Sequence, residues 1–365
     1  KRQAGTSANM NMNEVIANRA NELLGGEKGG YTRVHPNDHV NMAQSTNDVI
    51  PTAGKLTVLD LLKPLLTELD RLKRELTIKA TAFDDVIKMG RTQLQDAVPM
   101  RLGQTFHAYA SMVERDRKRI ADSCKEMYTV NLGGTAIGSA INVSDAYFYN
   151  VVPCLARITG YPLSQAADLF DATENLDGFV AVSGAVKTCA VNLSKMCNDL
   201  RLLSSGPRTG LGEINLPAKQ NGSSIMPGKV NPTQCEAMTM VAVQVMGNDA
   251  AIGFAASQGN FELNVFMPVI AYNFLQSVRL LSDVMISFND HCAVGIKANR
   301  EKMKHNLHNS LMLVTALNPY IGYDNAAKTS KKAYKENISL KEACVQLGFL
   351  TAEKFDEVFH PEEMA

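Results

Sequence analysis

The residue types best suited to chemistry lie in one short segment, Gly222–Pro232, which reads G-S-S-I-M-P-G-K-V-N-P. It places two adjacent serines, a lysine and an asparagine on a stretch punctuated by glycine and proline. A serine hydroxyl is a poor base in water, but backbone N–H groups and a nearby ammonium can stabilise its alkoxide in a closed pocket. Lys229 can supply that ammonium, so the segment predicts a site at which a serine accepts a proton.

The same composition is also typical of an exposed turn, because Gly, Pro, Ser and Asn are the residues that turns favour. Two observations favour a site. Ile225, Met226 and Val230 alternate with polar residues, which is unusual for a solvated loop. The segment also ends a non-helical run from Ser204 to Asn231, and connections this long in compact proteins are usually lids or binding loops.

Long helices must position these loops. Apolar residues recur every three or four positions between Thr52 and Ala80, which predicts a helix with one buried stripe that Pro64 should kink or interrupt. Similar patterns predict helices over Leu102–Val130, Ala172–Leu203, Gln234–Phe254 and Asn264–Ser287. The last two are apolar on more than one face, which predicts contacts between subunits. The charged run E-R-D-R-K-R that starts at Glu114 is expected to form a solvated face.

Beyond residue 294 the pattern changes to shorter helices, including Leu340–Leu347 and Thr351–Val358 joined at Gly348. Strand signals are nearly absent, so the predicted fold class is all-α. We expect a long-helix bundle domain over residues 1–294, which carries the active-site motifs, and a small C-terminal helical domain over residues 295–365.

Composition excludes several function classes. Lys and Arg together number 37, as do Asp and Glu, so no overall field favours nucleic acid or an anionic membrane. The chain is 45% hydrophobic, without a run of eighteen apolar residues, which is typical of a soluble protein. Its seven cysteines form no C-x-x-C pair and have no histidine at zinc spacing. They predict reduced, mostly buried thiols, a cytoplasmic location and no metal site.

Taken with two further strings, Gly222–Pro232 resembles the signature of the aspartase/fumarase superfamily, G-S-S-x-M-P-x-K-x-N. The other strings are Gly5–Asn13 followed by Gln44–Asp48, and Gly90–Asp96, which reads G-R-T-Q-L-Q-D. The resemblance covers essentially all 365 residues in the family's order. It implies a homotetramer built around a helical bundle, with each active site shared by three subunits. Family members carry a further N-terminal domain, which we expect to be absent here.

The reaction implied by the resemblance is β-elimination from a small dicarboxylate to give fumarate, without a cofactor. Removing a proton next to a carboxylate creates a dianionic aci-carboxylate, so donors and positive charge must surround that group. Carried over by position, Ser223 is the general base, and Glu236 orients Lys229. The residues expected to hold the carboxylate that becomes the aci-acid are Thr6, Ser45 and Ser224, and those for the other carboxylate are Thr92, Lys229 and Asn231. Ser45–Asp48 could also cap a helix, and the two roles are compatible.

The leaving group is the open choice. G-T-S at Gly5, Thr46 and Gln93 look like aspartase, because fumarases typically show G-T-Q, Q-S-S-N-D and G-R-T-H at these strings. Three other strings look like fumarase: T-Q-C-E-A-M-T-M after Pro232, G-G-T-A at Gly133 and F-E-L-N-V-F at Phe261.

A neutral amide can accept from a substrate ammonium, whereas an imidazole suits a hydroxyl or water. We therefore expect an aspartate ammonia-lyase, with Gln93 near the leaving group and with Thr46 and Asn47 helping to bind the amino group. The alternative is a class II fumarate hydratase. A non-catalytic helical scaffold is a third possibility, against which the retention of Ser223, Lys229 and Asn231 argues.

Overall fold

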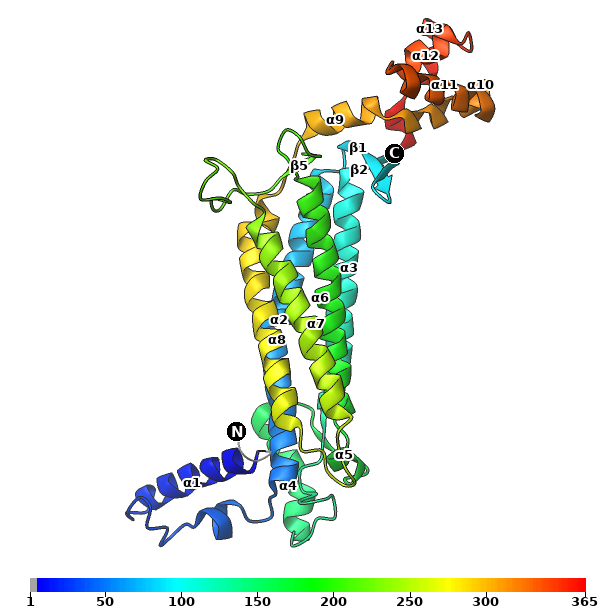
Figure 1. Cartoon of the computed structure of the whole chain (residues 1–365). Coiled ribbons are helices and arrows are strands. Elements are labelled where there is room, and N and C mark those ends of the chain that lie inside the picture. The colour runs from blue at the N-terminus through cyan, green and yellow to red at the C-terminus, as the bar shows by residue number, and fades with distance from the viewer. Residues whose placement is uncertain (1–4) are drawn as a thin grey trace. The chain divides into compact units, whose positions relative to one another are not determined.

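The computed structural model describes residues 5–365, and the opening Lys1–Ala4 lies outside the described part. Long helices dominate it, which confirms the all-α bundle prediction (Figure 1). The chain divides into two compact units. Unit 1 comprises the residues up to Asp70 with Glu114–Lys195 and Ala237–Ile286, and unit 2 comprises Arg71–Val113, Met196–Glu236 and Ser287–Ala365. The predicted division after residue 294 stays a prediction.

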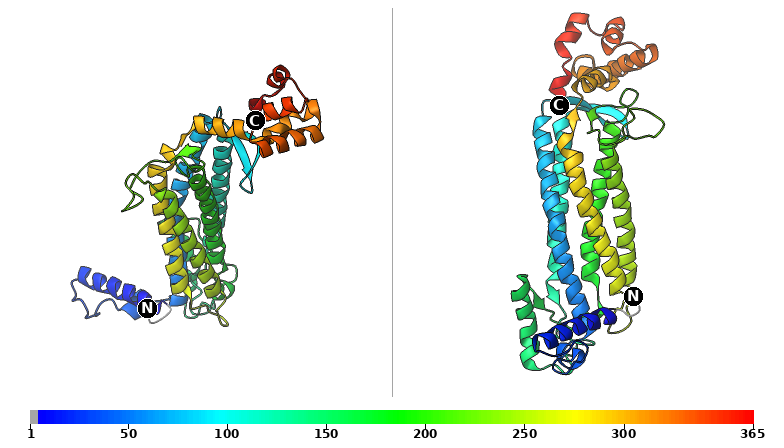
Figure 2. Two further views of the ribbon diagram at one scale, coloured as in Figure 1. Left: turned by 45° about the horizontal axis from the view of Figure 1, so that its top comes forward. Right: turned by 90° about the vertical axis from the view of Figure 1, so that its left-hand side faces the viewer.

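Five long helices contribute a segment to each unit, and within unit 1 these segments run side by side (Figures 1 and 2). They are α2 (Thr46–Ala82), α3 (Leu102–Ser123), α6 (Asp177–Leu203), α7 (Thr233–Ala256) and α8 (Met267–His291). Each covers most of a segment that the apolar periodicity predicted, and the ends differ by a few residues.

The core of unit 1 follows the predicted stripe of α2, in which Leu62, Leu65 and Leu69 are fully buried. A close approach of helices depends on Gly54. A Cβ added there would lie 2.9 Å from Met267 Cε of α8 and 3.3 Å from Phe179 Cζ of α6. A side chain at position 54 would therefore require the ends of the Met267 and Phe179 side chains to move.

Two expectations for the helices were wrong. The helix α2 runs through Pro64 without the interruption that was one of the two predicted outcomes, and a kink there stays a prediction. The apolar stripe on both sides of the proline packs into the core and outweighs one missing hydrogen bond. The charged run on α3 is not wholly solvated, since Asp116 is fully buried. Asn192 of α6 donates to both Asp116 oxygens, at 2.8 and 2.9 Å, and Arg119 pairs with the same carboxylate. These partners satisfy a buried charge that periodicity alone assigns to the surface.

Smaller elements complete unit 1. They are α1 (Thr6–Leu23), the π-helix η1 (Pro36–Val40), the 3₁₀ turn η2 (Cys124–Met127), α4 (Asp145–Thr159), α5 (Asp171–Glu174), and the strands β3 (Thr129–Val130) and β4 (Ser164–Gln165), which pair in parallel. The helix α4 is capped at its start by Ser144, whose side chain accepts from Tyr147 N, and at its end by Gly160, which has a φ of 74°.

Unit 2 holds a β-hairpin and a set of short helices. The hairpin consists of β1 (Ile87–Thr92) and β2 (Gln95–Arg101), and β5 (Ile214–Asn215) pairs antiparallel with β6 (Lys297–Ala298). The remaining elements are η3 (Ala293–Gly295), α9 (Arg300–Asn309), η4 (Leu311–Leu317), α10 (Asn318–Ile321), α11 (Tyr323–Glu336), α12 (Leu340–Gln346), α13 (Ala352–Val358) and η5 (Pro361–Met364). A separate apolar cluster that includes Leu313, Leu317, Ala333, Ala343 and Phe355 holds the short helices together.

The helix α7 is apolar on two faces, as expected. Met238, Ala242 and Val245 are buried, whereas Met240 and Val243 are 69% and 67% exposed. The span Met267–Gly295, which contains α8, is long and apolar enough to cross a membrane by length and composition alone. Ile270, Phe274 and Leu281 in that span are buried, as in the core helix of a bundle. All seven cysteines are free, and six of them are buried.

Candidate active site

The loop before α7 folds back on itself around Ser223. Gly222 N donates to Lys229 O at 2.7 Å, and Asn221 pairs with Val230, so the two ends of the loop are joined. Within the loop, Ser223 Oγ accepts from Ile225 N at 3.2 Å and from Met226 N at 3.1 Å. Hydrogen bonds donated to an oxygen stabilise its anionic form. Two backbone N–H groups of the loop therefore donate to the hydroxyl of Ser223, the predicted base.

Lys229 and Asn231 lie at the other end of the same loop. Both line a cavity of about 420 Å³ in unit 2, which Arg201, Ser204 and Asn215 also line. Two cationic side chains and several neutral donors suit this cavity to a carboxylate. Ser224 is exposed, and Glu236 lies in the first turn of α7.

The apolar residues of this loop do not anchor it within one chain, contrary to expectation. Ile225 is 83% exposed, and Met226 and Val230 are about half exposed. The polar–apolar alternation therefore marks a surface that unit 2 leaves uncovered, rather than a packed loop.

The Gly90–Asp96 string forms the tip of the β1–β2 hairpin. Thr92 pairs with Gln95 across a two-residue turn, in which Gln93 and Leu94 have φ values of 51° and 62°. Positive φ at both central residues is typical of the tight turns that match strand twist. Gly90 is required at the base, since a Cβ there would lie 2.7 Å from Val98 O. Thr92 and Gln93 are consequently presented to solvent at the end of a fixed turn.

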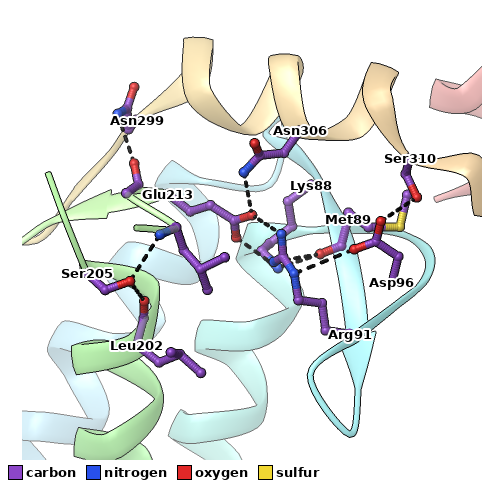
Figure 3. Close-up of polar contacts among 12 residues, drawn as sticks. Lys88, Met89, Arg91, Asp96, Leu202, Ser205, Glu213, Asn299, Asn306 and Ser310 are labelled. Carbon is purple, nitrogen blue, oxygen red and sulfur yellow. Dashed lines mark hydrogen bonds and ion pairs between the residues drawn. The ribbon is translucent and has the colours of Figure 1, made fainter. Parts of the chain in front are cut away.

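Next to the strands of this hairpin lies a buried charged cluster that the sequence motifs did not predict (Figure 3). Glu213, fully buried, pairs with Arg91 Nη2 at 2.8 Å and with Lys88 Nζ at 3.2 Å, and Asn306 donates to it at 3.2 Å. Burial alone would raise the pKa of Glu213, but the hydrogen bond from Arg91 and the charges of Lys88 and Arg91 hold that pKa below its ordinary value. One signal was visible in sequence: Glu213 is the lone acid in the glycine-rich run G-L-G-E-I.

The Q-S-T-N-D string forms the start of α2 in unit 1. Ser45 Oγ accepts from Asn47 N at 3.2 Å, and Asp48 Oδ1 accepts from Ser45 N at 3.0 Å, which is a helix cap. The other Asp48 oxygen accepts from Gly133 N and Thr135 N, at 3.1 and 3.0 Å. Burial raises the pKa of Asp48. The capping interpretation thus holds for Ser45 and Asp48.

Asn47 is also committed to structure. Its side-chain amide donates to Ala136 O at 2.7 Å, and its backbone carbonyl oxygen accepts from Asn131 Nδ2 at 3.0 Å. Thr46 and Ser45 remain partly exposed beside it.

Thr6 opens α1 directly after Gly5, which has a φ of 104°. A Cβ at Gly5 would lie 3.0 Å from Ile50 Cγ1 and 3.4 Å from Thr46 Cγ2, so the start of α1 lies against the first turns of α2. Unit 1 therefore brings Thr6 close to the Ser45–Asn47 cap. Thr92, Gln93 and the Ser223 loop belong to unit 2.

No three His, Cys, Asp or Glu side chains are grouped to bind one metal ion within residues 5–365. The absence of a metal or cofactor requirement stays a prediction.

Comparisons with known proteins cover nearly the whole chain. A family model described as "Lyase" matches residues 1–247, and one described as "Fumarase C C-terminus" matches residues 313–365. The chain is 54% identical over 362 residues to the class II fumarate hydratase of Neisseria meningitidis, covering 99% of this chain and 78% of that protein. It is 56% identical over 354 residues to that of Thermosynechococcus vestitus, covering 97% and 76%. The structure of the class II fumarase of Schistosoma mansoni superposes with a TM-score of 0.94 at 42% identity, covering 99% and 79%.

These relatives overturn the ammonia-lyase expectation, which was wrong. It rested on the G-T-S string at Gly5, on Thr46 and on Gln93, whereas the similarity to fumarate hydratases extends over almost every element. A physical reason concerns Asn47. Its side-chain amide donates to Ala136 O, so this structural contact, and not a substrate ammonium, can account for an asparagine at position 47. The three strings that looked like fumarase were the better guide, and only T-Q-C-E-A-M-T-M, in α7, lies in a helix.

Proposed function

Because the chain belongs to the aspartase/fumarase superfamily, we propose that it is a class II fumarate hydratase, which interconverts L-malate with fumarate and water. The choice of substrate rests on one observation. More than half of the residues, along almost the whole chain, are identical to those of fumarate hydratases.

Ser223 is the proposed base. It takes the proton from the carbon next to one carboxylate of L-malate, and the electron pair moves into that carboxylate to give the aci-acid. The electron pair of the aci-acid then forms the carbon–carbon double bond of fumarate while the bond between the neighbouring carbon and its hydroxyl breaks. The leaving hydroxide takes a proton from solvent to become water, and Ser223 returns the abstracted proton to solvent, which restores its alkoxide. The N–H groups of Ile225 and Met226 stabilise the Ser223 alkoxide before the transfer.

The other motif residues hold the substrate. Lys229 and Asn231 bind the carboxylate remote from the proton, with Thr92 as a further donor, and Glu236 orients Lys229. Thr6, Ser45 and Ser224 bind the carboxylate on which the charge develops. A lysine contact to a carboxylate is charge-assisted and stronger than a neutral hydrogen bond.

We also propose that the active enzyme is a cytoplasmic homotetramer in which each site combines residues of three subunits. The exposed hairpin tip, the exposed Ile225 and the exposed face of α7 support this assembly, since all three are apolar or functional surfaces that one chain leaves open. Sedimentation equilibrium should give the mass of four chains, and a fully active monomer would contradict the proposal.

The substrate can be tested by following fumarate through its ultraviolet absorbance, with L-malate and L-aspartate offered separately. We expect turnover of L-malate alone. Ser223→Ala should lower kcat by about 10²–10⁴-fold, the usual contribution of a general base. Ser257→Ala is the matched control, because Ser257 Oγ only donates to Phe254 O and accepts from the neighbouring Gln258 Nε2, just beyond the end of α7. Turnover of neither substrate would favour the non-catalytic scaffold.

A further inference from the structure

Two loops of unit 2 that carry proposed substrate-binding residues meet at one buried acid. Glu213 belongs to the long segment that leads to Ser223, and Arg91 immediately precedes Thr92 on β1. The two side chains pair at 2.8 Å, with Glu213 fully buried and the Arg91 side chain only 16% exposed (Figure 3). A contact of this kind fixes two segments that are far apart in sequence.

The hairpin is held on both strands. Arg91 Nε lies 3.8 Å from Asp96 Oδ1 on β2, and Ser310 Oγ donates to Asp96 Oδ2 at 2.8 Å. Arg91 and Asp96 are register partners, one step from the Thr92–Gln95 pair. The place of Arg91 therefore sets the place of the Thr92–Gln93 turn.

Glu213 is equally fixed through its backbone. Its N–H donates to Leu203 O at 2.8 Å, at the end of α6, and its carbonyl accepts from Asn299 N at 2.9 Å. Asn299 Nδ2 also donates to the adjacent Gly212 O at 2.9 Å. The carboxylate thus projects from a point that cannot shift without breaking contacts to α6 and to the start of α9.

We propose that Arg91 and Glu213 are positioning residues, which hold the Thr92–Gln93 turn and the segment leading to Ser223 in one rigid frame. Neither residue is assigned contact with substrate. This inference rests on the proposed function for its kinetic consequence, because Thr92 binds a substrate carboxylate only under that proposal.

Arg91→Lys is the decisive variant. It keeps a positive charge but removes the planar fork that reaches Glu213 and Asp96 together. Displacement of a substrate-holding group by about 1 Å can lower a rate by as much as 10²-fold. We expect KM for L-malate to rise about tenfold or more. A purely structural role would lower the folded fraction, and hence the apparent kcat, with KM unchanged.

The matched control is Arg300→Lys. Arg300 pairs with Asp85 through two contacts of 2.8 and 2.9 Å in the same unit, but it lies on the surface and touches neither loop. This variant should leave KM unchanged. An equal rise in KM in both variants, or no rise in Arg91→Lys, would overturn the inference.

Hydrogen exchange measured by mass spectrometry tests the frame without any substrate. In Arg91→Lys and in Glu213→Asp, amides of residues 87–101 and 204–231 should exchange faster than in the unmodified protein, whereas Arg300→Lys should not change them. Faster exchange in a protein that does not turn over L-malate would contradict the proposed function and leave the frame standing. Unchanged exchange in both variants would refute the frame, whatever the substrate. Glu213→Asp keeps the buried charge and so serves even if neutral substitutions do not fold.

Discussion

Two N–H groups of the backbone, from Ile225 and Met226, converge on Ser223 Oγ within one turn of the loop. This arrangement was predictable from residue types, because a glycine-flanked serine followed by a tight turn exposes successive N–H groups to its own side chain. The leaving group was not predictable in the same way. Asn47 is consistent with an ammonium site by type, but its side-chain amide also donates to a carbonyl 89 positions along the chain, a structural contact that the sequence does not reveal.

Gln93 is the residue at which the proposed hydratase departs from the histidine typical of fumarases. A neutral amide can orient the leaving hydroxyl but cannot give it a proton, whereas an imidazole can do both near its ordinary pKa of about 6.5. We expect Gln93→His to raise kcat/KM for L-malate. The plot of kcat/KM against pH should gain a titration step near the pKa of the imidazole, which the unmodified protein lacks. Gln95→His, on the other side of the turn, is the control. An unchanged profile in Gln93→His would separate residue 93 from the proton transfer.

Among the elements, the long helices were predictable because each buries a stripe that repeats every three or four residues. The exceptions have tertiary causes. Pro64 is tolerated because packing on both sides of it holds α2 together, and Asp116 is buried because Asn192 of another helix satisfies it. The β1–β2 hairpin escaped notice because its turn, Gln93–Leu94, adopts positive φ without glycine or asparagine, the usual signals.

The buried cluster around Glu213 also predicts how stability depends on pH. The pKa of Glu213 is lower in the folded chain than its ordinary value of 4.5, so the folded state binds fewer protons there. Its contribution is present above pH 4.5 and is lost as the pH falls below that value. Glu213→Gln should cost about 3–5 kcal/mol at pH 7, because it leaves the buried Lys88 without its paired carboxylate and Arg91 with Asp96 alone.

Urea unfolding at one protein concentration, at pH 7 and again below pH 4.5, measures this effect. The difference in the free energy of unfolding between the unmodified protein and Glu213→Gln should be smaller at the lower pH. Asp85→Asn, which breaks an exposed pair, should cost about 1 kcal/mol or less. A pH-independent cost for Glu213→Gln would mean that cavity or packing changes, and not charge, account for it.

For the whole molecule, the apolar surfaces that one chain leaves open are as informative as its core. Three apolar side chains are exposed on the chain: Met240 and Val243 on α7, and Ile225 on the loop that carries Ser223. The sequence predicts that α7 is apolar on two faces. It does not predict which element or subunit covers the second face, because periodicity indicates burial but not the partner that causes it. The proposed tetramer gives these surfaces their partners.

The division of motif residues between units, with Thr6 in unit 1 and Ser223 in unit 2, has a genetic consequence if each site draws them from different subunits. Chains disabled by Thr6→Val and chains disabled by Ser223→Ala should complement each other. When the two are co-expressed, some mixed tetramers contain a site built from two undamaged contributions, and L-malate turnover should reappear. Ser223→Ala and Lys229→Met should fail to complement, because one loop always carries both positions. Equal recovery in the two crosses would rule out sites shared in this way. If sites are shared, two alleles that each abolish activity alone restore activity together when they alter different loops, and fail to do so when they alter the same loop.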